Sequence, residues 1–148
     1  RLLTDDHLTL ALAESCTGGL LASELVAIPG CSKFLLEGCV AYSDDAKLRR
    51  LGVKPETLAQ FGAVSEACAR EMAEGIRAAS GASYALATTG YAGPDGGTEE
   101  DPVGTVYIAL ASAQGTQVKR IRLFGERARI REISCLHAFD LLRRTLCQ

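Results

Sequence analysis

The amino-acid sequence predicts an α/β fold, a three-layer α/β/α sandwich around a mixed, mostly parallel sheet. Apolar runs at residues 8–13 and 84–89 are continuous, as in strands that are buried on both faces. Segments with helical spacing separate these strands, and two strand-like segments near residue 110 indicate a late hairpin. Because 148 residues are the usual size of one folding unit, we expect a single domain over residues 1–148.

Two strands and a connecting helix are expected at the start of the chain. A strand over residues 8–13 leads through a tight turn into a helix over residues 18–27, which stops at a Pro-Gly pair. A second strand is expected over residues 34–42, in which Gly38 marks a bulge or a close backbone approach. This order places residues 14–19 at the carboxyl end of the first strand.

Capping residues define three helices in the middle of the chain. Ser43 and Ser65 are candidate N-caps, and Pro55 suits the first position of a helix. Glycines that follow the apolar pattern mark the helix ends. The predicted helices cover residues 44–51, 55–62 and 66–80.

The second half repeats the strand pattern and adds a long final helix. Residues 84–89 form a strand that ends in a loop with four glycines. Such a loop brings backbone N–H groups to the strand end, with a flexible surface connection as the alternative. Residues 103–112 and 117–124 are expected to pair as an antiparallel hairpin. The last helix, residues 127–146, carries His137 on its apolar stripe, so His137 is interpreted as a packing residue.

Polar side chains follow three of the predicted strands, where open α/β sheets bind ligands. Ser15 on the first turn is a candidate nucleophile, with helix capping as the alternative. His7 precedes the first strand and is expected at the opposite end of the sheet. Lys47 can serve as the base if burial or a helix N-terminus lowers its pKa, whereas Asp44 and Asp45 favour its charged form. An ordinary surface lysine remains the alternative.

Composition and charge disfavour several classes of function. A net charge of −2 and a pI near 5.7 argue against broad nucleic-acid binding, which depends on phosphate neutralisation. No apolar run approaches the ~20 residues that cross a membrane, and no signal peptide is visible. The 6 cysteines include no C-x-x-C pair and adjoin neither histidine, so reduced thiols are expected and a metal site is not. We therefore expect a cytoplasmic protein without membrane partners.

Basic residues gather near the C-terminal end. Arg127 and Arg131 are four residues apart and share a face at the start of the last helix. Two guanidinium groups on one face suit the fork-like binding of a phosphate or carboxylate. The other basic residues of this region are interpreted as solvated strand surface: Lys119, Arg120 and Arg122.

Five motifs extend over nearly the whole chain: Glu14-Ser15-Cys16-Thr17-Gly18-Gly19, Tyr42-Ser43-(x)3-Lys47, Gly62-Ala63-Val64-Ser65, Thr89-Gly90-(x)-Ala92-Gly93-Pro94-(x)-Gly96-Gly97 and Pro102-Val103-Gly104-Thr105-Val106. In these motifs and their order, the sequence resembles the C-terminal domain of the CinA competence and damage-inducible family. Stand-alone members of that family are nicotinamide-nucleotide amidases. The molybdopterin-binding-like first domain of full-length members is absent from this sequence.

The resemblance implies hydrolysis of nicotinamide mononucleotide to nicotinic acid mononucleotide and ammonia, without a metal or other cofactor. Ser15 would be the nucleophile, Lys47 its general base, and Tyr42 an orienting or proton-relaying group. Contacts to the substrate or to the tetrahedral oxyanion are implied for Thr17, Gly18, Gly19, Thr89, Gly90, Gly93, Arg127 and Arg131.

One position departs from the family pattern. Family members often carry Asn where this chain has Asp44, which adds a negative charge beside the implied base. The family also includes domains without amidase activity, so the alternative is a catalytically silent nucleotide-binding or protein-interaction module. The expected partners are a small-molecule nucleotide substrate and, through the edge strand and small-residue helices, a second copy in a homodimer.

Overall fold

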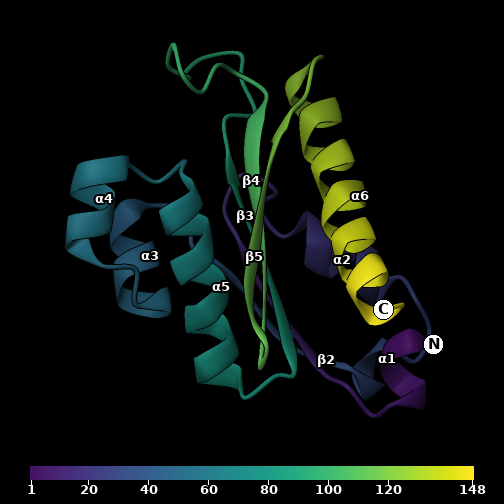
Figure 1. Cartoon of the computed structure of the whole chain (residues 1–148). Coiled ribbons are helices and arrows are strands. Elements are labelled where there is room, and N and C mark those ends of the chain that lie inside the picture. The colour runs from purple at the N-terminus through teal and green to yellow at the C-terminus, as the bar shows by residue number, and fades with distance from the viewer.

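Helices cover both faces of a five-stranded sheet in the computed structural model, which describes residues 1–148 (Figure 1). The strands, in sheet order, are β2 (Leu35–Val40), β1 (Leu10–Glu14), β3 (Tyr84–Gly90), β4 (Thr105–Ser112) and β5 (Gly115–Arg122). β1 is parallel to β2 and β3, whereas β4 is antiparallel to both β3 and β5. The helical layers confirm the predicted α/β class.

The sheet is half antiparallel, so the prediction of a mostly parallel sheet was wrong. A parallel connection needs a crossover, usually a helix, to bring the chain back to the same end of the sheet. Residues 91–104, between β3 and β4, contain no helix. The chain therefore turns back at the end of β3, and β4 runs antiparallel to it.

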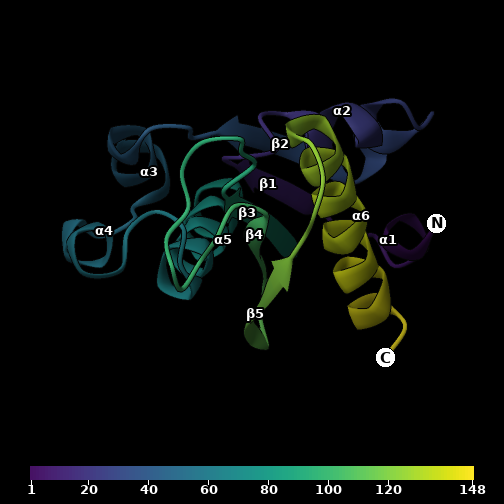
Figure 2. The ribbon, with the colours of Figure 1, turned by 90° about the horizontal axis from the view of Figure 1, so that it is seen from above.

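The helices divide into two groups, which Figure 2 separates clearly. One face carries α1 (Leu2–Asp5), α2 (Leu20–Val26) and α6 (Arg127–Leu146), and the other carries α3 (Asp44–Leu51), α4 (Pro55–Phe61) and α5 (Glu66–Ser80). Ser43 and Ser65 cap α3 and α5, as predicted. The short α1 and the 3-10 turn η1 (Cys31–Lys33) were not predicted, because one turn is too short to show a period. No helix has the length and apolar character that a membrane crossing requires.

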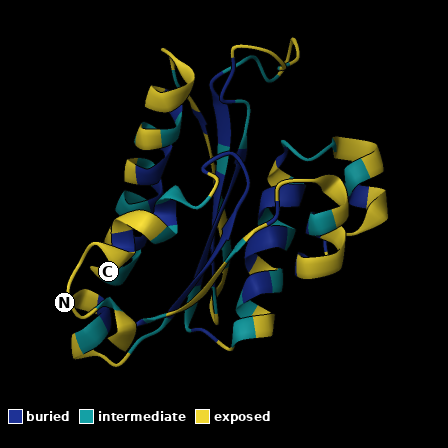
Figure 3. Ribbon diagram, turned by 180° about the vertical axis from the view of Figure 1, so that it is seen from behind, coloured by how far each residue is buried: buried dark blue, intermediate teal, exposed yellow.

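The two sides of the sheet are packed with side chains of different size. The side that carries α2 and α6 is filled by large residues such as Leu12, Leu86 and Ile108. The α5 side is lined mainly by strand alanines: Ala11, Ala13, Ala85, Ala87 and Ala109. These small side chains let α5 lie close to the sheet, and α3 packs on α5. Figure 3 shows the buried strands between helices with exposed outer faces.

The irregularity in the edge strand lies two residues from its predicted position. The register between β1 and β2 shifts at Leu36, where Leu10 and Ala11 pair with Leu35 and Glu37. A Cβ added at Gly38 would meet its nearest neighbour at 3.6 Å, an ordinary contact. The prediction of a bulge or a close backbone approach at Gly38 was therefore wrong, because the register shifts at Leu36 and only side chains at ordinary distances surround Gly38.

α5 and α3 lie close together at Gly75. A Cβ there would overlap the backbone carbonyl of Leu51, the last residue of α3. Alanine would gain about 1 kcal/mol in intrinsic helix propensity, but overlap with backbone, which cannot move aside as a side chain would, puts the overpacking cost at the upper end of its range, about 2–3 kcal/mol. We expect Gly75→Ala to lower the free energy of unfolding by about 1–2 kcal/mol in urea denaturation.

Ala79→Gly on the exposed side of α5 provides the comparison, since it changes helix propensity without a packing contact. It should cost about 1 kcal/mol. A Gly75→Ala protein as stable as the wild type would contradict the packing described for α3 and α5.

Candidate active site

A cleft of about 250 Å³ opens at the edge of the sheet where β1, β2 and β3 end. Parallel strands bring their carboxyl ends to one edge, and the segments that follow them form the cleft. The loop after β3 and the start of α6 complete its walls. The predicted site residues that line the cleft are Ser15, Tyr42, Lys47, Thr89, Gly90, Gly93 and Arg127.

Ser15 and Lys47 form a hydrogen-bonded pair in this cleft. The Lys47 Nζ atom lies 2.9 Å from the Ser15 Oγ atom. The Ser15 N–H donates to the carbonyl of Thr88 in β3, at 3.0 Å, which fixes the turn after β1 to the sheet. Lys47 lies in the first turn of α3 and is 1% exposed, and Ser15 is 8% exposed. The fold therefore aligns a hydroxyl and an amine with little contact with water.

The environment of Lys47 favours the neutral amine. Burial lowers the pKa of Lys47 below that of an ordinary lysine, while the Asp44 carboxylate acts in the opposite direction. Nζ also donates to the carbonyl oxygens of Ala41 and Tyr42, each at 3.0 Å. A neutral amine has two N–H groups for these two carbonyls, so its lone pair can accept the Ser15 proton. This is the geometry of a general base.

Cys16 also lines the cleft, directly after Ser15. Burial raises the pKa of its thiol to about 11. Burial likewise raises the pKa of Cys68, on the α5 side of Lys47, to about 11. Both side chains are therefore protonated thiols near neutral pH, and the nucleophile that the geometry supports is the Ser15 hydroxyl.

Tyr42 and Arg127 form the rim of the cleft. One Arg127 nitrogen, Nη1, donates to the Gly93 carbonyl at 2.6 Å, and Nη2 donates to the Tyr42 hydroxyl at 3.1 Å. Arg127 thus joins the end of β2, the loop after β3 and the start of α6. The Tyr42 hydroxyl accepts from Arg127 and makes no hydrogen bond to Ser15 or Lys47, and the Tyr42 group that contacts Lys47 is the backbone carbonyl.

Thr89 and the glycines after it also line the cleft. The Thr89 hydroxyl donates to the Ala63 carbonyl at 2.8 Å, and Gly90 and Gly93 line the cleft. Gly93 has a φ of 82°, and a Cβ there would come within 2.6 Å of the Val103 side chain. Glycine is therefore required for the loop to follow this path.

Four residues for which substrate contacts were implied do not line the cleft: Thr17, Gly18, Gly19 and Arg131. Thr17 is fully buried, and its hydroxyl lies 2.6 Å from the Glu14 carboxylate. Arg131 donates to the carbonyls of Cys16 and Thr17. These groups hold the turn that carries Ser15. Sequence reasoning assigned no role to Glu14, although a carboxylate at the end of an apolar strand was the signal that could have revealed it.

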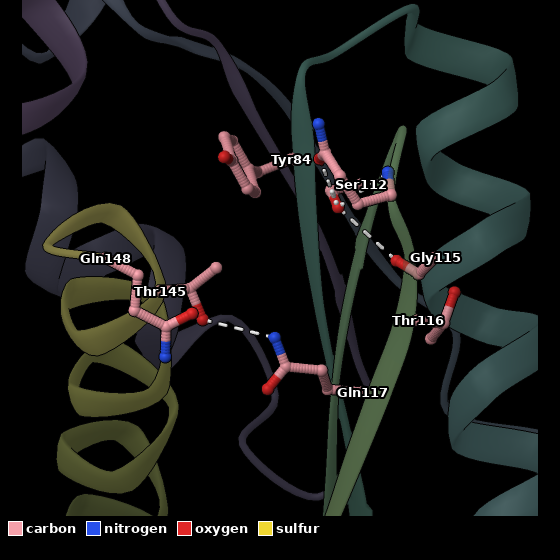
Figure 4. Close-up of a pocket in the computed structure, with 8 residues that line it drawn as sticks. Tyr84, Ser112, Gly115, Thr116, Gln117, Thr145 and Gln148 are labelled. Carbon is pink, nitrogen blue, oxygen red and sulfur yellow. Dashed lines mark hydrogen bonds between the residues drawn. The ribbon is translucent and has the colours of Figure 1, made fainter.

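The cavity beside the β4–β5 hairpin offers no comparable arrangement. A cavity of about 340 Å³ between the β4–β5 hairpin and the end of α6 is lined by hydroxyl and amide side chains such as Ser112, Gln117 and Thr145 (Figure 4). It contains no lysine, histidine or carboxylate side chain to act as a base. No three His, Cys, Asp or Glu side chains are placed to hold a metal ion. His137 is half-buried on α6 and outside the cleft.

The sequence is similar to known proteins over nearly its whole length. The family model of the CinA C-terminal domain matches residues 1–146. A CinA-like protein from Syntrophotalea carbinolica is 53% identical over 146 residues, and one from Kosmotoga olearia is 52% identical over 145 residues. These matches cover 99% and 98% of this chain. The chain spans only 35% of the length of each relative.

Solved structures extend the similarity to three dimensions. The crystal structure of competence damage-inducible protein A (ComA) from Klebsiella pneumoniae has a TM-score of 0.95 and 41% identity, covering 99% of this chain and 91% of that one. A CinA superfamily protein from Escherichia coli has a TM-score of 0.93 and 36% identity, covering 97% and 83%. On the family match, these relatives and the shared fold, the chain belongs to the CinA C-terminal domain family.

Proposed function

We propose that this domain is a nicotinamide-nucleotide amidase that hydrolyses the carboxamide of nicotinamide mononucleotide. The observation that supports this proposal most is the buried hydrogen bond between Lys47 Nζ and Ser15 Oγ, at 2.9 Å, in a cleft at the carboxyl ends of the strands. Membership of a family that includes such amidases supports the choice of substrate. The products are nicotinic acid mononucleotide and ammonia.

The first half-reaction transfers the acyl group to the protein. The Ser15 oxygen attacks the carboxamide carbon while its proton passes to the neutral Lys47 amine. The C–N bond then breaks, and the Lys47 ammonium returns the proton to the departing nitrogen, which leaves as ammonia. The carbonyl re-forms as an ester on Ser15.

The second half-reaction uses the same two groups with water. Lys47 takes a proton from a water molecule as the water oxygen attacks the ester carbon. The bond from this carbon to the Ser15 oxygen breaks, Lys47 returns the proton to that oxygen, and the nucleotide acid leaves. Lys47 ends each half-reaction neutral, as it began, so a lowered pKa is useful throughout the cycle.

Arg127 is the group that we assign to the substrate phosphate. A guanidinium has five N–H donors, and Arg127 uses two of them on Gly93 and Tyr42. The other donors remain for an anion at the rim of the cleft. Arg131 donates to two carbonyls of the Ser15 turn and does not line the cleft. A nucleotide bound in this way directs its phosphate to the rim and its carboxamide to Ser15.

Ammonia release from nicotinamide mononucleotide tests the proposed reaction. We expect Ser15→Ala and Lys47→Met to lower kcat/KM by about a thousandfold or more, because they remove the nucleophile and the base. Methionine keeps the volume of the buried lysine, and Ser32→Ala and Lys119→Met are matched substitutions at exposed positions outside the cleft. Equal rates in all variants would contradict the mechanism. Wild-type protein that binds the nucleotide without releasing ammonia would support a catalytically silent nucleotide-binding module instead.

The pH dependence of kcat/KM tests the role of Lys47 as a base. Activity should rise with pH as Lys47 loses its proton, and the midpoint should lie below the ordinary lysine value of 10.5 because burial lowers the pKa. Asp44→Asn should move the midpoint lower, because the Asp44 carboxylate favours the ammonium form. Asp45→Asn is the control, since Asp45 is exposed and paired with Arg49. A midpoint at or above 10.5 would refute the assignment.

Comparing two substrates tests the role of Arg127. Arg127→Gln should raise KM for nicotinamide mononucleotide by about 10- to 100-fold, the value of a charge-assisted hydrogen bond. KM for nicotinamide riboside, which lacks the phosphate, should change by less than about twofold. The exposed neighbour Arg129→Gln is the control. Equal losses with both substrates would show that Arg127 acts through its bonds to Gly93 and Tyr42 and not on the phosphate.

A further inference from the structure

Glu14 is a buried carboxylate that immediately precedes Ser15 in the chain. It is 1% exposed and forms no ion pair. Its oxygens accept hydrogen bonds from the Thr17 hydroxyl at 2.6 Å and from three N–H groups: Gly19 at 3.2 Å, Leu21 at 2.9 Å and Ala22 at 3.1 Å. Donors at the positive end of α2 therefore compensate the charge of Glu14.

The remaining N–H groups of the turn fall into two sets. Those of Ser15, Gly18 and Leu20 donate to backbone carbonyls of β3 or of the turn itself. Those of Cys16 and Thr17 donate to no other residue, and that of Cys16 meets only its own thiol, a weak acceptor. Because an N–H group without a strong acceptor costs free energy when buried, the Cys16 donor is available to an oxygen of a bound molecule, whereas Thr17 does not reach the cleft. Cys16 lines the cleft next to the nucleophile.

Arg131 lies on α6, which packs against α2, and it also holds the Ser15 turn (Figure 2). Its Nε atom donates to the Cys16 carbonyl at 3.1 Å, and its Nη2 atom donates to the Thr17 carbonyl at 2.8 Å. In a planar trans peptide the C=O and N–H bonds point in opposite directions. The bond from Arg131 to the Cys16 carbonyl therefore sets the direction of the Thr17 N–H. In the preceding peptide, the Ser15 carbonyl accepts from the Gly18 N–H, and this bond sets the direction of the Cys16 N–H.

We propose that Glu14 and Arg131 are positioning residues that hold the turn so that the free N–H of Cys16 faces the oxyanion formed at Ser15. An N–H group of the residue after the nucleophile is well placed for this task. In this arrangement the positive end of α2 is occupied by Glu14, and the substrate phosphate is bound elsewhere. The inference rests on the proposed function for its natural substrate, but its test does not.

Phosphonylation of Ser15 by an alkyl fluorophosphonate provides a test that does not need the nucleotide. The Ser15 oxygen bonds to phosphorus, the P–F bond breaks, fluoride leaves and Lys47 receives the proton. The phosphoryl oxygen gains negative charge at the position where the amide oxygen would. The rate of this reaction, followed by intact-protein mass spectrometry, therefore reports the oxyanion donors directly.

Glu14→Gln keeps the shape of the side chain, removes its charge and places an NH₂ group among the donors. We expect phosphonylation to slow by about 10- to 100-fold at a temperature well below Tm, as for weakened oxyanion donors. On nicotinamide mononucleotide, kcat should fall by a similar factor, with KM within about twofold and the pH midpoint unchanged. Thr17→Val, which removes one donor to Glu14, and Arg131→Gln should slow phosphonylation in the same way.

Glu71→Gln is the matched control. Glu71 accepts from the Lys54 N–H at 2.8 Å and from the Thr57 hydroxyl at 2.6 Å, between α4 and α5 and outside the cleft. This substitution should lower Tm and leave phosphonylation within about twofold of the wild-type rate.

Three results would overturn the inference. A folded Glu14→Gln protein with the wild-type phosphonylation rate and a lower Tm would make Glu14 structural only. A raised KM with unchanged kcat would make it a ligand contact. If Glu14→Gln does not fold, a wild-type phosphonylation rate in Thr17→Val would also overturn the inference. Wild-type protein that is phosphonylated but releases no ammonia would refute the proposed function alone, and the variant rates would still decide the role of Glu14.

Discussion

Burial of the Lys47 amine is the constraint on which the rest of the site depends. An ammonium group that loses water must be compensated, and here Nζ meets one hydroxyl and two carbonyls. These oxygens come from the ends of β1 and β2, so the parallel pairing of the two strands forms the site. The strand alanines and Gly75 let α5 and α3 pack closely, and this packing keeps Lys47 out of water. The proposed chemistry therefore depends on the close packing of the alanine-rich layer.

Charges around this amine are arranged in two ways. Glu14 and Arg131 are tied into the backbone of the Ser15 turn, where they fix geometry. Asp44 lines the cleft and makes no hydrogen bond through its carboxylate, so its effect on Lys47 is electrostatic. Burial favours the neutral amine and Asp44 favours the ammonium. The balance between these two effects decides whether Lys47 can act as a base near neutral pH.

The sequence predicts the elements and the meeting of three strand ends well, because caps and apolar runs are local signals. It predicts the number of parallel strands poorly. The direction of β4 depends on the absence of a crossover helix in residues 91–104. The four-residue spacing of Arg127 and Arg131 indicates a shared helix face, but only tertiary packing reveals that one reaches the cleft rim and the other the Ser15 turn. Glu14 shows the same limit. Its place at the end of an apolar strand is a sequence signal, but its partners, the Thr17 hydroxyl and three backbone N–H groups, are found only in the structure.

The protonation state of Lys47 can be measured directly by NMR titration of its side-chain nitrogen in lysine-labelled protein, assigned by comparison with Lys47→Met. We predict a pKa below the ordinary lysine value of 10.5, because burial is the largest influence on this group. A pKa at or above 10.5 would mean that Ser15 faces a permanent ammonium at neutral pH. That result would contradict the Ser15–Lys47 mechanism whatever the distance between the two atoms.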